Sequence, residues 1–396
     1  MENVKFIRDS LYGNIKIDGV FLQLMESPEI QRLSGIKQLG LTYLVYPGAN
    51  HTRLEHSLGT SYMARKIATA LDFNETIAGV AALLHDIGHG PFSHTLEYLQ
   101  HRRMGKSHVD ITKEMILGHL FLPDYEYGIT IKDILSDYGI EARKIVDMIE
   151  GKTSKIVNGA LDADQMDYLM RDAYYTGVAY GVIDSDRIIQ TMKLHDDEIV
   201  FEKKGISALE SMLVARALMY SSVYLHKTVR IAELMLVKAV ELAEPFDFWY
   251  MNDGELMEKL KSMGGYQKEI ALRLKYRKLF KKAISINLFE LNEKQREAIE
   301  EMDIKEMEMK ISNKIGREGY VIIDMPGKDI LLSEPRLKKM DIKIIDGDKI
   351  IPLHECTPIA HAIKAREITE WSIMVCTPEK YRAEVKKYAE KMIFGG

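Results

Sequence analysis

The stretch "TIAGVAALLHDIGHGPFSHTLEYL", residues 76–99, is the part of this chain that decides its fold. It opens as an apolar helix, and its polar residues are gathered at the C-terminal end. Gly90 and Pro91 are expected to stop this helix before a second one begins. A pair such as His85 and Asp86 at the end of an apolar helix faces the interior or a cleft. Buried charges in such a place need partners or a metal.

Polar residues of the same kind recur on both sides of this stretch. Within it, His89 lies four residues after His85, so the two would share a helix face. Upstream, "RLEHSLGTSYMARKIA" places His56 in the first turn of another helix. Downstream, "LDADQMDYLMRDAYY" places four polar residues at helical spacing on one face that is too polar for plain core: Asp164, Tyr168, Arg171 and Asp172.

Two imidazoles and two carboxylates from these segments would make a mixed nitrogen and oxygen site. The four residues are His56, His85, Asp86 and Asp164. Such a set leaves positions open for water and substrate, and it suits Mn, Fe, Co, Ni or Zn better than a dedicated Mg or Ca cage. The alternative is a group of buried histidines capped by neighbouring acids, but three separate segments with glycine and proline punctuation favour the metal site.

Composition bounds the class of protein. The chain has 396 residues, is 46% hydrophobic and 29% charged, and carries a net charge of −5. Its length suffices for a large core and more than one domain, and its charge argues against a broad nucleic-acid-binding or anionic-lipid-binding surface. Cys356 and Cys376 are expected to be free thiols. The start lacks a signal peptide, and no apolar run approaches the roughly 20 residues of a membrane span, so we expect a cytoplasmic protein without membrane contact.

The pattern along the chain predicts a mainly α fold. We expect hairpins at residues 4–17 and 192–204, a helix over 20–39 interrupted near Pro28, an extended run over 41–52, and almost continuous helix from Leu54 to Leu242. Gly264 and Gly265 should break a later helix, and residues 292–316 should form a charged, exposed one. Further β-rich runs at 320–326, 329–334, 342–351 and 371–378 precede an amphipathic helix over 379–394. We therefore predict a helical core over 1–312, with the metal-site region at about 51–190, and a small C-terminal α+β unit over 313–396.

Five ordered sequence words carry a family resemblance: "QRLSGIKQLG", "YPGANHTRLEHSLG", "LLHDIGHGPFSH", "LDADQMDYLMRD" and "YLHK". Together they resemble the HD-domain metal-dependent phosphohydrolases and, within them, the deoxynucleoside triphosphate triphosphohydrolases. The resemblance covers roughly residues 4–240. It implies an HD-domain helical core and assigns the metal to the four residues that the spacing also selects.

The resemblance also implies an activity. The family hydrolyses a dNTP to a deoxynucleoside and triphosphate with one divalent transition metal (Mn, Fe, Co, Ni or Zn) and an additional Mg on the substrate phosphates. His94 matches the histidine that protonates the leaving nucleoside oxygen, and His108 matches a second catalytic histidine. Glu97 matches the acid that partners the first of these histidines. His89 is expected to be structural or to support the metal ligands.

Substrate contacts are implied in the same way. Arg53 matches a phosphate-binding arginine, Gln38 and Asp172 match residues that bind the sugar 3′-hydroxyl, and Leu39 crowds the 2′ position. The helix "ISALESMLVARALMYSSVYLHK" would place four residues on one narrow face: Arg216, Tyr220, Tyr224 and Lys227. Buried salt bridges are the alternative explanation for its two cations. The resemblance makes Arg216 and Lys227 phosphate or base contacts and places Tyr224 against the deoxyribose. Tyr168 completes the substrate set.

Two positions, Ser34 and Gln165, depart from the family pattern, and the second bears on the substrate. Gln165 stands where the vertebrate pattern has a phosphate-binding lysine. This substitution supports an alternative hypothesis, a phosphohydrolase that acts on another nucleotide or on a phosphomonoester. Another alternative is a nucleic-acid-binding protein with weak or vestigial nuclease activity. Our prediction is a dNTP triphosphohydrolase that forms homo-oligomers.

Overall fold

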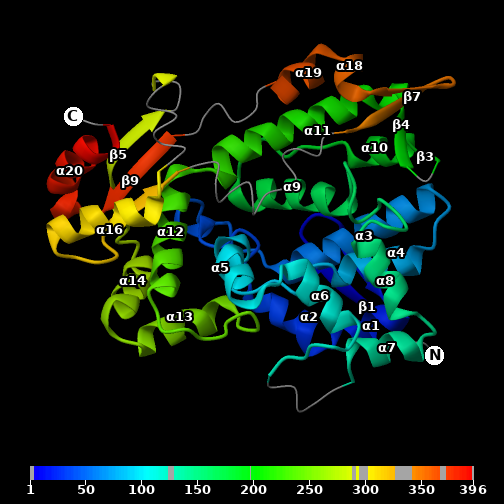
Figure 1. Cartoon of the computed structure of the whole chain (residues 1–396). Coiled ribbons are helices and arrows are strands. Elements are labelled where there is room, and N and C mark those ends of the chain that lie inside the picture. Colours follow the sequence, from blue (N-terminus) through cyan, green and yellow to red (C-terminus); the bar gives the residue numbers. More distant parts are fainter. Residues whose placement is uncertain are drawn as a thin grey trace.

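Helices make up most of the chain in the computed structural model (Figure 1). The structure describes residues 4–123, 129–196, 198–287, 291–293, 302–325, 341–365 and 372–394. No helix in these ranges combines the length and the apolar character that a membrane span requires. The predicted fold class, a helical core with short hairpins and a small C-terminal α+β unit, is confirmed.

The N-terminal hairpin is present, as β1 (Lys5–Asp9) paired antiparallel with β2 (Gly13–Ile17). Helices α1 (Gly19–Met25) and α2 (Pro28–Arg32) follow. The interruption lies where it was predicted. The hydroxyl of Ser27 caps α2, and Pro28 occupies its first position, where a missing amide hydrogen costs nothing.

The predicted helix ends before Leu39, because the next residues bond to another part of the chain. After a 3₁₀ turn at Leu33–Gly35, the Gln38 amide donates to the His51 carbonyl at 3.0 Å, and the Arg53 amide donates to the Ile36 carbonyl at 2.9 Å. The prediction of an extended run over 41–52 was also wrong, since its first residues form a 3₁₀ turn at Thr42–Leu44. This local pairing brings Gln38 beside the start of the next helix.

From Leu54 to Leu242 the regular structure of the described residues is helical apart from one hairpin, as predicted. The helices are α3 (Arg53–Ala70), α4 (Glu75–Leu84), α5 (His94–Met104), α6 (His108–Ile116), α7 (Ile131–Asp137), α8 (Ala142–Ile149), α9 (Ala163–Thr176), α10 (Ser185–Thr191), α11 (Ile206–Met219) and α12 (Lys227–Glu241). The predicted second hairpin joins α10 to α11 as β3 (Met192–His195) and β4 (Glu198–Glu202).

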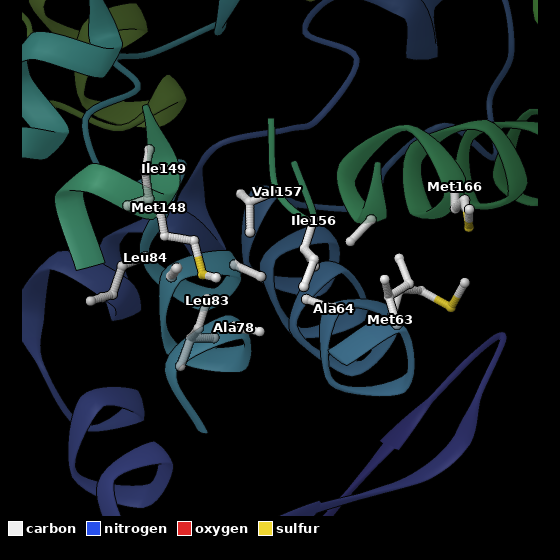
Figure 2. Packing of buried hydrophobic residues seen from close by; sticks show 14 of the residues in the cluster. Met63, Ala64, Ala78, Leu83, Leu84, Met148, Ile149, Ile156, Val157 and Met166 are labelled. Carbon is white, nitrogen blue, oxygen red and sulfur yellow. The ribbon is translucent and has the colours of Figure 1, made fainter. Parts of the chain in front are cut away.

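The hydrophobic core is centred on α3 and α4, which pack against each other. Figure 2 shows side chains of α3, α4, α8, α9 and the loop before α9 meeting in this cluster: Met63, Ala64, Ala78, Leu83, Leu84, Met148, Ile149, Ile156, Val157 and Met166. Leu83 is fully buried, and burying a leucine contributes about 1.5–3 kcal/mol. Because α4 is buried on every side from Ala78 to Leu84, this part of the helix is apolar, and its polar neighbours lie before Ala78 or after Leu84.

A second group of elements follows α12. Helices α13 (Asp253–Ser262) and α14 (Gly265–Lys275) are separated at Gly264, as predicted. Strands β5 (Lys281–Asn287), β6 (Ile322–Asp324) and β9 (Ser372–Thr377) form an antiparallel sheet in the order β5-β9-β6. Helices α16 (Ile304–Ile315) and α20 (Arg382–Phe394) lie beside it (Figure 1). Part of the predicted helix over 292–316 and the whole predicted strand over 329–334 lie outside the described residues.

The segment between β6 and β9 lies elsewhere. Strands β7 (Lys343–Asp346) and β8 (Lys349–Pro352) extend the second hairpin into a sheet of order β3-β4-β7-β8, in which β7 runs parallel to β4. The short helices α18 (Leu353–Cys356) and α19 (Pro358–Ala365) follow, and α19 packs against α11 (Figure 1). Elements from both sides of residue 313 thus share one sheet, and the boundary there stays a prediction.

Candidate metal centre and substrate site

Helix α3 begins at a capping box that sets the position of His56. Thr52 and Glu55 exchange hydrogen bonds between side chain and backbone, which fixes the first turn. His56 then points inward and is 1% exposed. Its Nδ1 lies 2.8 Å from Asp167 Oδ2, and its Nε2 lies 3.1 Å from Asp164 Oδ1. Asp167 thus holds one ring nitrogen while the other faces the site.

His85 and Asp86 follow the last turn of α4 directly. The helix ends at Leu84, earlier than Gly90 and Pro91 predicted, so His85 and His89 do not share a helix. The physical reason is a competing side chain, because the Thr112 hydroxyl accepts from the Gly88 amide at 2.9 Å and donates to the His85 carbonyl at 3.2 Å. The turn that replaces the helix leaves Asp86 between the two histidines.

The ring of His85 is oriented by its own helix. Its Nδ1 lies 2.7 Å from the Ala82 carbonyl, to which a protonated Nδ1 would donate. Its Nε2 is buried and has no hydrogen-bond partner among the described residues. An imidazole whose Nδ1–H is bound to an oxygen presents Nε2 as a lone pair, which is the form that binds metals.

The four predicted ligands converge. Donor atoms of His56, His85 and Asp164 all lie within 4.8 Å of one another. Asp86 Oδ1 lies 3.2 Å from His85 Nε2, and Asp86 Oδ2 lies 3.8 Å from His56 Nε2. Two imidazole nitrogens and two carboxylates fit a divalent transition metal. The unpartnered His85 Nε2 is the observation that shows this fit.

The charges of Asp86 and His85 suit metal binding, whereas His56 would have to release a proton to bind a metal. Burial lowers the pKa of His56, but hydrogen bonds to Asp164 and Asp167 outweigh burial and raise it to about 10. Burial lowers the pKa of His85, which keeps this ring neutral. Burial raises the pKa of Asp86, but Arg53 together with His85 and His89 outweighs burial and holds the pKa well below its usual value. A carboxylate and a neutral imidazole are both ready to act as ligands.

A second group of histidines lies beside the first. The rings of His89 and His108 stack with centroids 3.9 Å apart. Glu97 joins His94, whose Nδ1 lies 2.9 Å from Oε2, to His108, whose Nδ1 contacts Oε1. Burial raises the pKa of Glu97, but the charge and hydrogen bond of His108 outweigh it and hold the pKa far below the usual range. Donor atoms of Asp86, His89 and His108 also lie within 4.8 Å of one another, so His89 adjoins the cluster.

Arg53 connects the metal cluster to this region. It is 1% exposed, its Nη1 donates to Asp86, and its Nε donates to the Ser93 hydroxyl at 2.6 Å. Its Nη2 is buried and has no hydrogen-bond partner among the described residues. The Oε1 atom of Gln38 has none either.

Asp172 and Tyr224 form the predicted sugar region together with a residue that the sequence did not single out. The Tyr224 hydroxyl donates to Asp172 Oδ2 at 2.8 Å, and His51 Nε2 lies 2.7 Å from Asp172 Oδ1. The rings of Tyr168 and Tyr220 meet Tyr224 edge to face, with centroids 6.2 and 5.0 Å away. Leu39 is partly buried against the main core.

The predicted narrow face of four residues on one helix was wrong. Helix α11 ends at Met219, Tyr220–Tyr224 forms a π-helix, and Lys227 begins α12, where it is exposed. The wider π turn rotates the residues that follow, so Lys227 leaves the face that Arg216 begins. Arg216 is buried, and its Nη1 donates to Gln165 Oε1 at 3.0 Å.

Comparison with known proteins agrees with this geometry. The model of the HD domain matches residues 53–172, and the model of the HD associated region matches residues 183–394, more than half of the chain. The chain belongs to the HD-domain family. It is a metal-dependent HD phosphohydrolase that resembles the deoxynucleoside triphosphate triphosphohydrolase branch.

Relatives of this HD protein extend over its whole length. An uncharacterized protein of Methanocaldococcus jannaschii, MJ1154, is 38% identical over 97% of this chain and 81% of its own. A crystal structure of a hypothetical protein from Aquifex aeolicus is 30% identical, covers 98% of this chain and 100% of its own, and has a TM-score of 0.74. The deoxynucleoside triphosphate triphosphohydrolase SAMHD1 homolog of Dictyostelium discoideum is 29% identical over 61% of this chain and 50% of its own. Several further curated relatives are also matched over only about half of their length.

The sequence did not single out two residues that support the HD site, Asp167 and His51. Arg171, predicted to share a face with Asp164 and Asp172, turns instead toward Asp167 and Asp9, with nitrogen to oxygen distances of 2.9 Å. Asp167 could have been found from the sequence, because it lies four residues before Arg171, the spacing of a helical ion pair. Only the tertiary structure shows that His51 reaches Asp172.

Proposed function

We propose that this protein is a dNTP triphosphohydrolase, which converts a dNTP and water to a deoxynucleoside and triphosphate. The proposal is supported by the HD family membership and by the Dictyostelium relative that carries this activity in its name. The observation that carries it is the buried guanidinium of Arg53, whose Nη2 has no partner among the described residues beside the metal cluster. A buried donor of this kind needs an anionic oxygen, such as one of a phosphate.

The bond to be broken joins the α-phosphorus to the 5′ oxygen of the nucleoside. Water adds its oxygen to the phosphorus, and the leaving 5′ oxygen takes a proton. When bound to His56, His85, Asp86 and Asp164, the metal supplies Lewis-acid polarisation of a phosphate oxygen. His94 is the proton donor in this proposal. Glu97 lies against its Nδ1 and would hold the ring in the orientation and tautomer that proton donation needs.

The sugar is proposed to bind beside Asp172. This carboxylate is fixed by His51 and Tyr224 and keeps further lone pairs for a 3′-hydroxyl. Gln38 supplies the unpartnered carbonyl oxygen as a second acceptor. Leu39 and Tyr224 crowd the 2′ side, and a buried, unpaired 2′-hydroxyl there would cost about 1–3 kcal/mol.

A phosphohydrolase that acts on another nucleotide or on a phosphomonoester is the second candidate. It is favoured by Gln165, which is buried, hydrogen-bonds Arg216, and brings no charge of its own. Exposed Lys227 stands apart from Arg216 on the next helix. Fewer cations around the phosphates weaken the grip on a triphosphate, so KM for a dNTP should be high.

Turnover of each dNTP and NTP with Mn, Mg, Ni, Co and Fe, with the phosphate products separated, tests both candidates. The proposal expects triphosphate as product and a kcat/KM about ten- to a hundredfold higher for dNTPs than for NTPs. Equal rates on ATP and dATP would refute the sugar contacts. Release of inorganic phosphate alone would favour the second candidate.

A further inference from the structure

We propose that the C-terminal sheet holds the start of α5 in place through Asp324, Arg230 and Glu233, which makes these three positioning residues for His94. The inference rests on the proposed function, in which His94 donates the proton. It assigns a task to the sheet β5-β9-β6, which contributes no residue to the metal cluster.

The chain immediately before His94 is strained. Phe92 and Ser93 have φ angles of 55° and 50°, in the left-handed region that side chains rarely adopt. Such a conformation is unfavourable for a residue with a side chain and persists only where its surroundings hold it. Three side-chain hydrogen bonds hold these residues directly. Asp253 accepts from the Phe92 amide at 2.7 Å, Arg53 donates to the Ser93 hydroxyl, and this hydroxyl donates to the Lys37 carbonyl at 3.2 Å. Ser93 itself makes no side-chain cap to α5.

The residue after His94 is held from the opposite direction. The Thr95 hydroxyl donates to Glu233 Oε1 at 3.3 Å. Glu233 Oε2 accepts from Arg230 Nη1 at 3.4 Å, and Arg230 Nη2 donates to Asp324 Oδ1 at 2.9 Å. The side chains of Arg230, Glu233 and Asp324 are only 19%, 18% and 6% exposed, so water screens them little. A polar path thus runs from β6 through α12 to the first turn of α5.

Apolar contacts join the same elements as this polar path, but they act differently. Leu96 and Leu99 of α5, Met235 and Leu236 of α12 and Ile322 of β6 belong to one buried cluster. Such contacts set how closely the elements approach, yet they are non-directional. The hydrogen bonds of Glu233 and Arg230 add direction, and therefore define how the first turn of α5 presents His94.

The chain offers a matched control. Lys238 Nζ binds Glu308 Oε2 at 2.6 Å, and Glu308 Oε1 accepts from the Ile323 amide at 2.8 Å. This ion pair joins α12 to the same C-terminal elements as Arg230 does. Among the described residues, neither side chain of this pair hydrogen-bonds the first turn of α5. Glu308→Gln therefore perturbs the same interface without touching the path to His94.

Hydrogen–deuterium exchange at residues 92–97, with the full chain, tests the positioning itself. Glu233→Gln and Asp324→Asn should increase exchange there, and Glu308→Gln should not. Unchanged exchange in Glu233→Gln, or an equal increase in Glu308→Gln, would overturn the proposal. Exchange that responds as expected in a protein that turns over no dNTP would instead reject the proposed function and leave the positioning intact.

Kinetics test the link to His94. Glu233→Gln should lower kcat by about three- to tenfold, a modest part of the loss that misplacement can cause, with KM and metal content unchanged. In a His94→Ala background the same change should lower kcat no further, because its effect passes through His94. An additional loss in that background, or a lowered metal content, would show a general structural role instead. Thr95→Ser should keep the wild-type rate, and Thr95→Val should match Glu233→Gln.

Discussion

The two histidine groups of this site differ in how they are held. His56 and His85 are 1% and 6% exposed, and each has its Nδ1 against an oxygen of the fold, from Asp167 and from the Ala82 carbonyl. The side chain of His94 is 44% exposed, with Glu97 against its Nδ1 and the rings of His89 and His108 beside it. A metal ligand needs one fixed geometry in a dry place. A proton donor needs contact with a substrate that comes and goes.

The sharpest way to break this comparison is to remove a buried ligand. Asp86→Asn should lose the metal and reduce turnover to background, because a neutral amide replaces the carboxylate between His85 and Arg53. Metal analysis and phosphate-release assays measure both effects, and circular dichroism should show the helices retained. Full activity in a metal-depleted Asp86→Asn protein would end the metal-site interpretation.

Changing the exposed His94 should reduce turnover by less and should leave the metal content unchanged. His94→Ala should lower turnover by about 10²–10⁴-fold, the usual contribution of a positioned acid or base. Its metal content should equal that of the wild type, since the ring lies outside the ligand cluster. If the variant instead arrives without metal, His94 belongs to the first group, and the distinction between the two groups fails.

The carboxylates that contact the two histidine groups, Asp167 and Glu97, allow a third test of the comparison. Asp167→Asn should weaken metal affinity or activity by about 10–100-fold, because it removes the carboxylate that orients His56. Arg171 would keep its contact with Asp9, so the fold should survive. Glu97→Gln is the matched change at the other group and should lower turnover with metal affinity unchanged. Metal titration of both variants by calorimetry compares them, and equal metal loss would contradict the separation.

The smallest effect concerns stability. Burial raises the pKa of Asp253 to about 6, above its unfolded value, despite hydrogen bonds from the Lys37 and Phe92 amides. A raised pKa means that the stabilising contribution is present at low pH and is lost as the pH rises through 6. The stability of the wild type relative to Asp253→Asn should therefore fall by about 1–3 kcal/mol between pH 4.5 and 7.5. Urea unfolding at both pH values measures it, and a constant difference would contradict the burial argument.

Features that depend on residues close in sequence could be predicted, and features that depend on distant residues could not. The capping residues Thr52 and Glu55 lie within three residues of each other, so the start of α3 and the place of His56 could be inferred from the sequence. The end of α4 could not, because Thr112, more than twenty residues away, bonds the Gly88 amide and the His85 carbonyl that would have continued the helix. The π-helix at Tyr220–Tyr224 likewise removed Lys227 from a face that regular periodicity predicted.

The sequence by itself determined the mainly α fold, the hairpins and the identity of the residues that gather at the metal cluster, because apolar periodicity, caps and short motifs act over one or two helical turns. Only the tertiary structure decided how those residues are supported. Asp167 behind His56, His51 behind Asp172 and Glu233 beside Thr95 depend on how distant helices pack. Packing is non-local, and no short stretch of the chain encodes which buried polar groups will meet.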